Sequence, residues 1–394
     1  MTVADEGRVD GPRVGLVTIA REWGGIGCIG FGGPPTHIAL LRQLCVERRT
    51  WITAEEFEDG IAATNLLPGP ASTQLAIFAA WRLRGVAGAV VGGVCFIAPG
   101  LVLILALAAL FLAGDPPLWV RGAAAGAGSA VAAVAVQAAW SLVPASWKRA
   151  GPARPARARW IGYGLAGGTA AALTGPWLVL VLIAAGLVEV TVRTDAGPGA
   201  VRRLRSWPLL ASAPAAGGGL PALVWVALKI GALSYGGGFV IIPLMQADAV
   251  DHYHWMSDGQ FLNAVALGQI TPGPVVQTVA VVGYAAAGVG GGLLAAAVAF
   301  APSFLFVILG GPRFDRLRAD PRVQAFLTGA GPAVIGAIAG SAIPLALALQ
   351  HAWQFGVLAG AAIWLLAARR GVVSALLGAG ALGVVAALVG WSVT

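Results

Sequence analysis

Two short Pro-Gly-Pro segments, each inside an apolar stretch, are the residues of this chain best suited to chemistry. They are Pro68-Gly69-Pro70 and Pro272-Gly273-Pro274. Proline ends a helix because it lacks an amide hydrogen and clashes with the preceding turn. Glycine permits a sharp reversal, and the second proline suits the first turn of a new helix. Each segment therefore predicts a break between two helices inside an apolar region.

A helix that begins inside an apolar layer favours binding of an anion. Its first backbone N–H groups are unpaired, and its start carries roughly half a positive charge. Unsatisfied donors are costly at bilayer depth, so they must face protein, water or a ligand. Polar side chains beside the two breaks add further groups: Asn65, Ser72, Thr73, Gln74, Gln269, Thr271, Gln277 and Thr278. With the two Pro-Gly-Pro segments, these residues form the predicted binding site for a small oxyanion.

The two breaks belong to two copies of one sequence unit. Residues 51–70 align without a gap with residues 255–274, and at the same offset Phe31-Gly32-Gly33 aligns with Tyr235-Gly236-Gly237. Such self-similarity marks an internal repeat, and paired broken helices in two halves point to the substrate site of a transporter. One Pro-Gly-Pro alone is as well explained by a kink or surface turn. The turns at Gly32, Gly33, Gly236 and Gly237 join the site as further backbone donors, with close helix packing as the alternative.

The composition is that of a helical integral membrane protein. The chain is 58% hydrophobic and 11% charged, with a mean hydropathy of +0.82, whereas a soluble domain carries about 25% charged residues. Apolar runs such as 86–113 are long enough to cross a bilayer as helix, and the alternating pattern of a barrel is lacking. We expect an all-α polytopic membrane protein with two inverted-topology repeats, about ten transmembrane helices and two broken re-entrant hairpins.

Charged residues predict how the two copies lie in the membrane. Lysine and arginine cluster in expected loops at 42–49, 148–159, 193–205 and 313–322, which the positive-inside rule places in the cytoplasm. The expected loop at 246–258, the repeat partner of a basic loop, holds aspartates and no lysine or arginine, so we place it outside. Equivalent stretches on opposite sides indicate inverted repeats. We expect a first repeat over residues 1–192, a basic Gly/Pro linker over 193–219 and a second, inverted repeat over 220–394.

Local signals place the helix boundaries. Thr53 with Glu56 and Ser257 with Gln260 fit the capping box, so helices should begin at Ala54 and Asp258. Each half should hold one crossing, a broken hairpin and four more crossings. We expect the crossings at 14–31, 86–112, 121–146, 160–174 and 177–192, and at 221–236, 290–311, 323–349, 355–368 and 372–391; the hairpins should cover 54–82 and 258–286.

Three ionisable side chains are candidates for compensating the charge of the substrate or for coupling its movement to an ion. Lys229 lies in an apolar segment, where a charge is usually functional; snorkelling to an interface is the alternative. His37 follows a Gly-Gly-Pro-Pro turn and can share a proton or donate to an anion. Arg42 either marks an interface or faces a cavity.

Several classes of function are excluded by what the sequence lacks. The apolar segments contain no catalytic nucleophile, no acid–base pair and no residues at the spacing of metal ligands. The three cysteines are not at metal-ligand spacing either. No phosphate-binding loop of an ATP-driven pump is present. The net charge of +8 lies in short stretches between apolar runs, so it indicates topology rather than nucleic acid. We expect no enzyme activity, no cofactor and no metal ion.

At these residues the chain resembles the chromate ion transporter family in its long, two-domain form. The repeats of that family carry an FGGP or FGGG turn, a W-x-x-x-x-x-F segment and a Pro-Gly-Pro hairpin. Here they stand at 31–34, 51–57 and 66–70, and again at 235–238, 255–261 and 270–274. Asn65 stands where glutamine is expected, and Tyr235 stands in place of phenylalanine.

The resemblance implies chromate efflux across the bacterial cytoplasmic membrane, giving chromate resistance. The implied partners are the oxyanion and membrane lipid. Coupling to protons, exchange with another ion, sulfate or another small anion as substrate, inward transport and a homodimer all stay open. A membrane-embedded enzyme is the alternative from another class of function.

Overall fold

Helices form every regular element in the part of the chain that the computed structural model describes, which is residues 14–64, 69–112, 116–173, 178–193, 219–234, 241–310 and 320–393. The predicted all-α class is confirmed. In chain order the α-helices are α1 (Leu16–Ile29), α2 (Pro34–Arg42), α3 (Ala54–Thr64), α4 (Ala71–Phe111), α5 (Leu118–Ala150), α6 (Arg154–Leu173), α7 (Leu178–Arg193), α9 (Leu220–Leu233), α10 (Ile241–Gln246), α11 (Asp258–Ile270), α12 (Thr278–Gly310), α14 (Pro321–Leu347), α15 (Ala352–Ala362) and α16 (Val372–Leu388).

Four of the described helical segments are long and apolar enough to cross a membrane: Ala71–Phe111, Leu118–Ala150, Val275–Gly310 and Pro321–Leu347. Shorter apolar helices cover Leu220–Leu233, Ala352–Ala367 and Val372–Leu388. The structure thus indicates a multi-pass membrane protein, while the count of ten crossings stays a prediction. Helix α1 has 14 residues, so it is about 21 Å long and shorter than a hydrocarbon core of roughly 30 Å.

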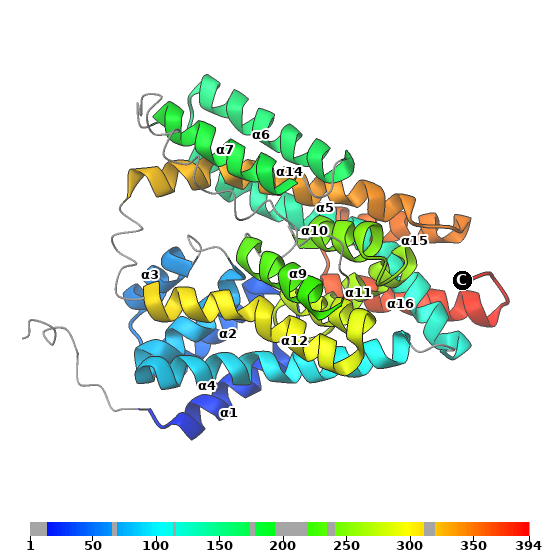
Figure 1. Ribbon diagram of the computed structural model, residues 1–394, viewed down its shortest axis with the longest axis horizontal. Coiled ribbons are helices and arrows are strands. Elements are labelled where there is room, and N and C mark those ends of the chain that lie inside the picture. The colour runs from blue at the N-terminus through cyan, green and yellow to red at the C-terminus, as the bar shows by residue number, and fades with distance from the viewer. Residues whose placement is uncertain are drawn as a thin grey trace, which may run out of the picture.

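The order of elements in the first copy recurs in the second (Figure 1). Helices α1 to α5 correspond to α9, α10, α11, α12 and α14, and the terminal pair α6–α7 corresponds to α15–α16. Even the irregularities recur. Within α4, Arg84 and Gly85 have φ of −146° and 61°, and within α12, Ala287 and Gly288 have φ of −154° and 63°. Two sequence copies have therefore folded into two copies of one helical unit.

Two stretches that we expected as loops are helical. After α2 the chain continues as a π-helical turn over Gln43–Arg48, and after α10 an equivalent π-helical turn covers Ala247–His252. In the first, Leu44 and Cys45 are buried. The expectation was wrong because the charged residues there mask a short apolar face that packs on the bundle. The linker expected at 193–219 lies, apart from its two end residues, outside the described part of the chain.

Gly69 and Pro70, the described residues of the first Pro-Gly-Pro segment, lie at the tip of a helical hairpin. Helix α3 and the start of α4 are antiparallel, because Glu56 pairs with Arg82 at the open end while Gly60 contacts Phe78 nearer the tip. At Gly85 the chain reverses again. The expected hairpin over 54–82, followed by a long helix from 86, is confirmed, and both capping boxes are formed.

The long limbs of α4 and α12 run side by side in opposite directions (Figure 1). Gly93 on α4 contacts Phe304 on α12, and Leu105, further along α4, contacts Gly292, which comes earlier on α12. The two limbs are equivalent elements of the two copies. Their antiparallel contact is the arrangement that a two-fold axis between inverted copies would produce.

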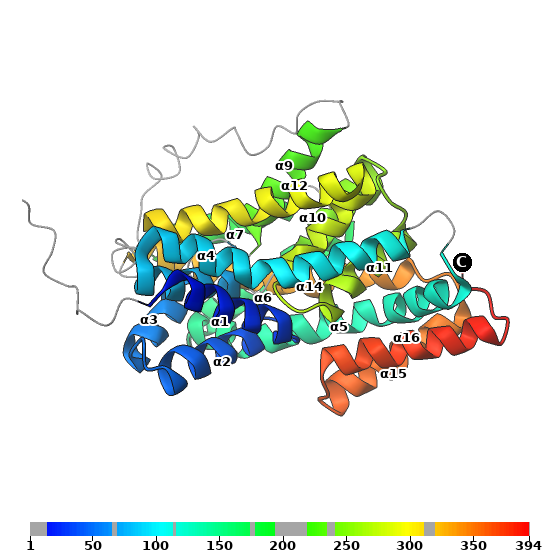
Figure 2. The ribbon, with the colours of Figure 1, turned by 90° about the horizontal axis from the view of Figure 1, so that it is seen from below.

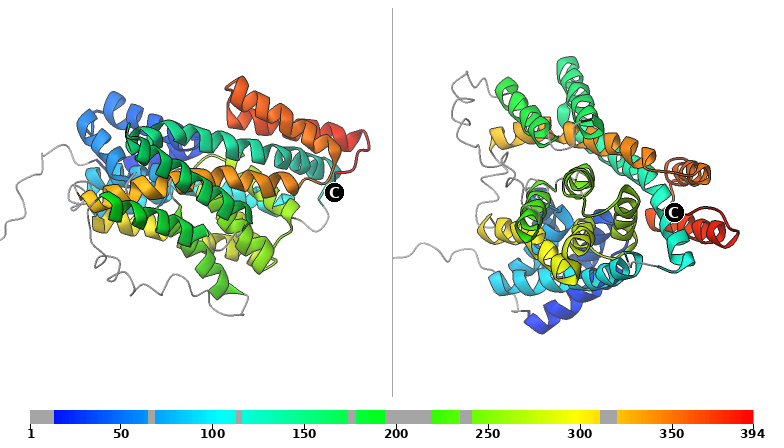
Figure 3. Two further views of the ribbon diagram at one scale, coloured as in Figure 1. Left: turned by 90° about the horizontal axis from the view of Figure 1, so that it is seen from above. Right: turned by 45° about the vertical axis from the view of Figure 1, so that its right-hand side comes forward.

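The helix that follows this limb in each copy packs mainly against the terminal helices of the other copy. Helix α5 lies beside α15 and α16 (Figure 2), and α14 lies beside α6 and α7 (Figure 3). Glycines bring the backbones close. Gly336 and Gly340 on α14 face Gly164 and Gly168 on α6. Small residues are the usual means of close packing between helices in membranes, where lipid is as apolar as leucine.

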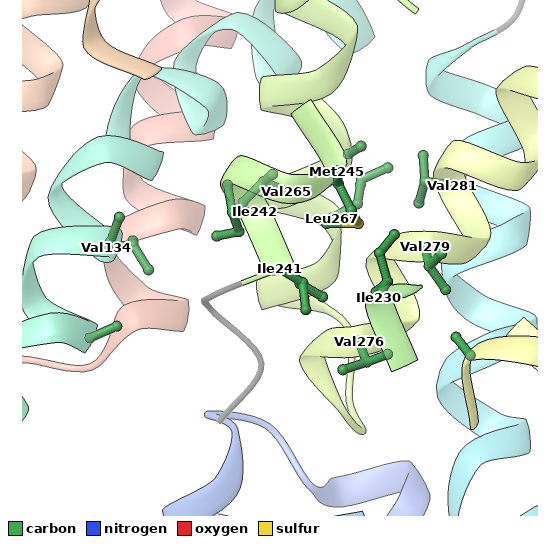
Figure 4. Packing of buried hydrophobic residues seen from close by; sticks show 14 of the residues in the cluster. Val134, Ile230, Ile241, Ile242, Met245, Val265, Leu267, Val276, Val279 and Val281 are labelled. Atoms are coloured by element: carbon green, nitrogen blue, oxygen red, sulfur yellow. The ribbon is translucent and has the colours of Figure 1, made fainter. Parts of the chain in front are cut away.

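Aliphatic side chains fix the second hairpin in the bundle. Ile230 of α9, Met245 of α10, Leu267 of α11 and Val279 of α12 are almost wholly buried against one another (Figure 4). This cluster surrounds the residues next to the second Pro-Gly-Pro segment. It holds that segment at a fixed place in the interior.

Candidate functional site

Helix α4 begins at the first tip, as predicted from Pro70. No side chain caps its start, and the N–H groups of Thr73 and Gln74 both bond to the Pro70 carbonyl at 3.0 Å. Gly69 has a φ of +127°, in the left-handed region that favours glycine. The Gln74 side chain lies over it, so that a Cβ added to Gly69 would clash with the Gln74 amide.

Two buried hydroxyls from different copies have no hydrogen-bond partner in the described structure. They are Thr73 Oγ1 on α4 and Ser303 Oγ on α12, and both residues are 0% exposed. Ser303 Oγ lies 3.1 Å from the position of a Cβ on Gly69, so it faces the first tip. Buried hydroxyls are nearly always hydrogen-bonded. A water or a ligand at this tip would complete both.

The second tip is closed by packing and differs from the first. Gly273 also has a positive φ, of 100°, but after Pro274 the chain makes a 3-10 turn over Val275–Gln277 before α12 begins at Thr278. Gln277 Nε2 donates to the Ile97 carbonyl at 2.8 Å, and Pro272 and Gln277 pack on Gly100 of α4. A new helical segment thus begins at Val275 as expected, but its first turn is 3-10 and the α-helix starts at Thr278.

The remaining polar candidates near the second tip divide into two groups. The hydroxyls of Thr271 and Thr278 each donate to a carbonyl of their own chain segment, Leu267 O and Val275 O, at 2.8 Å, so they are not free donors. Gln269 is 8% exposed, and its Nε2 has no partner among the described residues. Among the predicted donors that the structure describes at this tip, the Gln269 amide is the one without a partner.

A chain of hydrogen bonds joins the two tips through His37. The N–H of Gly273 donates to the Gly30 carbonyl at 3.0 Å. His37 Nε2 lies 2.8 Å from the same oxygen, and His37 Nδ1 lies 3.2 Å from Ser72 Oγ. The imidazole is 0% exposed and meets the Phe96 ring edge-on. Ser72 on the first tip is thus linked to Gly273 on the second.

The glycine turn before α2 makes this link possible. Gly32 and Gly33 have φ of 97° and 77°, which turns the chain from α1 into α2 and lets His37 reach back to Gly30. We expected the turn to supply backbone donors, whereas what it brings to the second tip is a carbonyl acceptor. Of the other predicted residues, Asn65, Pro68, Gly236 and Gly237 lie outside the described part of the chain.

The two other charged candidates are paired with carboxylates. Lys229 Nζ lies 2.5 Å from Asp248 Oδ2, with side chains 15% and 10% exposed. Arg42 ends α2 on the surface, where it pairs with Glu58 and lies 3.8 Å from Glu47. Neither side chain brings an uncompensated charge to a tip. Among the residues the structure describes, no group of three histidine, cysteine or carboxylate side chains could hold a metal ion.

Sequence reasoning missed Ser303 and Gly100, although a signal was present. Pro99-Gly100 in α4 and Pro302-Ser303 in α12 occupy equivalent positions of the two copies. Each pair contacts the Pro-Gly-Pro tip of the opposite copy. A pocket between α6, α10 and α14, lined by Asp251 and Asp258 among others, lies away from both tips, and its carboxylates would repel an anion.

The sequence matches a known family over both copies. The model of the chromate transporter family matches residues 17–190 and again residues 221–385. This chain belongs to the chromate transporter family. The match covers both copies of the unit, in agreement with the resemblance at the glycine turns and the Pro-Gly-Pro segments. No solved structure was found to match the chain.

The relatives of this family member are named as transport proteins. The chain is 33% identical to a chromate transport protein of Cupriavidus metallidurans, over 82% of this chain and 80% of that protein. It is 28% identical to a probable chromate transport protein of Synechococcus elongatus, over 86% and 87%, and 29% identical to a chromate transport protein of Pseudomonas aeruginosa, over 81% and 78%. This family member is therefore a transport protein and not an enzyme.

Proposed function

We propose that this chain is a secondary transporter that carries chromate out of the cell across the bacterial cytoplasmic membrane, and that it binds the oxyanion at the first tip. Membership of the chromate transporter family supports the substrate. The observation that carries the site is a pair of buried hydroxyls without a partner. Thr73 lies in the first turn of α4, whose start no side chain caps, and Ser303 Oγ lies against Gly69 at the same tip.

The chemistry of this tip suits a tetrahedral oxyanion. The helix start contributes roughly half a positive charge and unpaired N–H groups, and the hydroxyls donate from two sides. Hydrogen bonds to a charged ligand are stronger than those between neutral groups. Sulfate has the shape and charge of chromate. Hydroxyl and N–H donors therefore discriminate poorly between the two anions. A sulfate transporter is therefore the second candidate.

Transport by alternating access is supported by the arrangement of the two copies. Equivalent limbs of α4 and α12 lie side by side and antiparallel (Figure 1). The tip of each hairpin touches the long limb of the opposite copy, at Gly100 and at Ser303. Inverted repeats with broken helices at the middle of the bilayer are typical of secondary transporters, in which one repeat rocks against the other.

The outward direction follows from the charge of the substrate. A membrane potential that is negative inside acts on each charge with about 2.3 kcal/mol per 100 mV. For a dianion this amounts to roughly 4.6 kcal/mol per 100 mV in favour of export. A transporter that moves the dianion without full charge compensation therefore exports it from an energised cell, which gives resistance.

Flux in vesicles of known sidedness tests this proposal. Radiolabelled chromate should move when the protein is present, and an inside-negative potential should drive it outward. A Thr73→Val variant should lose most of this flux. Equal flux with and without the protein would exclude chromate transport, and faster movement of sulfate than of chromate would favour the second candidate.

A further inference from the structure

We infer that His37 is a proton-binding site that couples to the oxyanion site: its imidazole takes up one proton when the oxyanion binds at the first tip and releases it when the oxyanion leaves. The inference rests on the proposed function. It adds the nature of the coupling ion, the residue that carries it and the number of protons that move with each anion.

The two partners of the ring define its neutral form. Nε2 lies 2.8 Å from the Gly30 carbonyl, and a carbonyl oxygen can only accept, so Nε2 must carry hydrogen. Neutral His37 therefore has a lone pair on Nδ1. At 3.2 Å from Nδ1, Ser72 Oγ must donate its hydrogen to that lone pair. In this state the Ser72 hydroxyl hydrogen points at the histidine and away from any ligand.

Protonation of the ring reverses the Ser72 bond. With hydrogen on both nitrogens, Nδ1 donates to Ser72 Oγ, and the hydroxyl hydrogen of Ser72 must turn to another acceptor. Ser72 lies in the first turn of α4, next to Thr73, whose hydroxyl lacks a partner. An oxyanion bound at this helix start is the acceptor that the turned hydroxyl meets. Proton uptake thus adds one donor and one positive charge to the anion site.

The anion has the reciprocal effect on the histidine. An oxyanion that accepts the Ser72 hydrogen removes it from Nδ1 and leaves that lone pair free to take a proton. It also places negative charge near the ring. Because binding free energies are linked, whatever the proton contributes to anion affinity, the anion contributes equally to proton affinity.

Other charged groups around His37 are compensated by one another. On α1, Glu22 pairs with Arg49, and on α4, Arg82 pairs with Glu56 at the open end of the hairpin. On α2 itself, Arg42 pairs with Glu58. The other charged or titratable residues of these elements are Arg21, Cys28, Cys45, Glu47, Arg48, Arg84 and Cys95. No hydrogen bond or ion pair described for any of these groups is made to the imidazole, whose two nitrogens face Ser72 and Gly30.

The proton site occurs in one copy only. The repeat position of His37 is Ile241, a buried aliphatic residue at the start of α10. The second copy therefore lacks the imidazole that would bind the proton. One proton per oxyanion is therefore the expected ratio. The unit that moves then carries one negative charge where chromate alone carries two.

Calorimetry on the purified full-length protein tests the inference. Chromate binding is measured at pH 8 in buffers of different protonation enthalpy, because the dependence of heat on the buffer gives the number of protons taken up. Wild type should take up about one proton per bound chromate. At pH values above the histidine pKa, the affinity of the wild-type protein for chromate should fall by about tenfold per pH unit. His37→Gln keeps a donor for Gly30 and should bind with no proton uptake.

Each result bears on the inference separately from the proposed function. Wild type that binds no chromate would refute the proposed site, whereas binding without proton uptake would refute only the role of His37. Proton uptake that persists in His37→Gln would also refute the role of His37. It would indicate that the Lys229–Asp248 pair binds the proton instead. If His37→Gln fails to fold, Ser72→Ala replaces it: this variant keeps the imidazole and its bond to Gly30, and proton uptake equal to wild type would overturn the switch.

Discussion

At the scale of single residues, the unpartnered hydroxyls of Thr73 and Ser303 at the first tip are the sharpest test of the anion site. Replacing Thr73 by valine keeps the side-chain shape and removes one donor, and Ser303→Ala does the same from the opposite copy. A hydrogen bond to a charged ligand contributes about 1.5–3 kcal/mol, so we expect apparent chromate affinity to fall roughly 10- to 150-fold in each variant. The measurement is the concentration dependence of chromate uptake into vesicles.

Thr278→Val is the matched control for these variants. Its hydroxyl is as buried as that of Thr73 but already donates to the Val275 carbonyl, so its loss should leave chromate affinity near the wild-type value. If Thr278→Val weakened affinity as much as Thr73→Val, burial rather than anion contact would explain both effects, and the site would have to lie elsewhere.

Gly69 sets the shape of the first tip. Its φ of +127° disfavours any side chain, and a Cβ would clash with Gln74. We therefore expect Gly69→Ala to abolish chromate flux while the protein still inserts into the membrane, as judged by its amount in purified membranes. Gly219 has a φ of +103° with open space around it, so Gly219→Ala imposes the strain without the clash and should transport normally.

At the scale of helices, the Lys229–Asp248 pair joins α9 to the π-helical turn after α10. Removing one partner leaves a buried charge without its counterion, which costs about 3–5 kcal/mol. We expect Lys229→Met to lower the melting temperature in detergent, and Lys229→Arg to be milder because it keeps the charge. The double variant Lys229→Met with Asp248→Leu removes both charges and should recover stability.

Flux through that double variant separates two roles of the pair. We expect near-normal chromate flux, since the pair is neutral as a unit and His37 carries the coupling. A stable double variant without flux would show that Lys229 takes part in charge compensation, as the sequence first suggested.

Close packing of α14 on α6 depends on glycine. Gly336 leaves no room for a side chain, because a Cβ there would overlap the Gly164 backbone. We expect Gly336→Leu to push the helices apart and to lower the melting temperature clearly. Gly360 on α15 has open space around it, and Gly360→Leu should melt like wild type. Equal melting temperatures for the two variants would contradict the described packing of α14.

Helix boundaries were readable from the sequence because they depend on local rules. The capping residues Thr53 and Ser257 marked helix starts that the structure places at Ala54 and Asp258, and proline marked the breaks. Contacts across the bundle were not readable. The residues around Lys229 in the sequence do not indicate that it pairs with Asp248. Ser303 joins the site only because α12 passes the first tip. Long-range pairing is decided by packing, which a single sequence does not display.

At the scale of the whole molecule, the antiparallel contact of α4 and α12 predicts opposite orientations of the two copies in the membrane. Glu47 and Asp251 occupy the equivalent π-helical turns and are both exposed. Single cysteines at these positions, in a variant without Cys28, Cys45 and Cys95, should react from opposite sides with a reagent that does not cross membranes. Reaction of both from one side of intact cells would rule out inverted copies.

Because α5 and α14 each pack on the terminal helices of the other copy, folding of the first copy depends on synthesis of the second. Helix α5 is complete at residue 150, but its main partner, α16, begins at residue 372. At 5–20 residues per second, synthesis takes roughly 10–45 s to bridge that interval. During this time the glycine-lined face of α5 lies against lipid or against the insertion machinery. The first copy therefore cannot finish folding before the ribosome has nearly completed the second, and a stop between the copies leaves α5, α6 and α7 without their main partners.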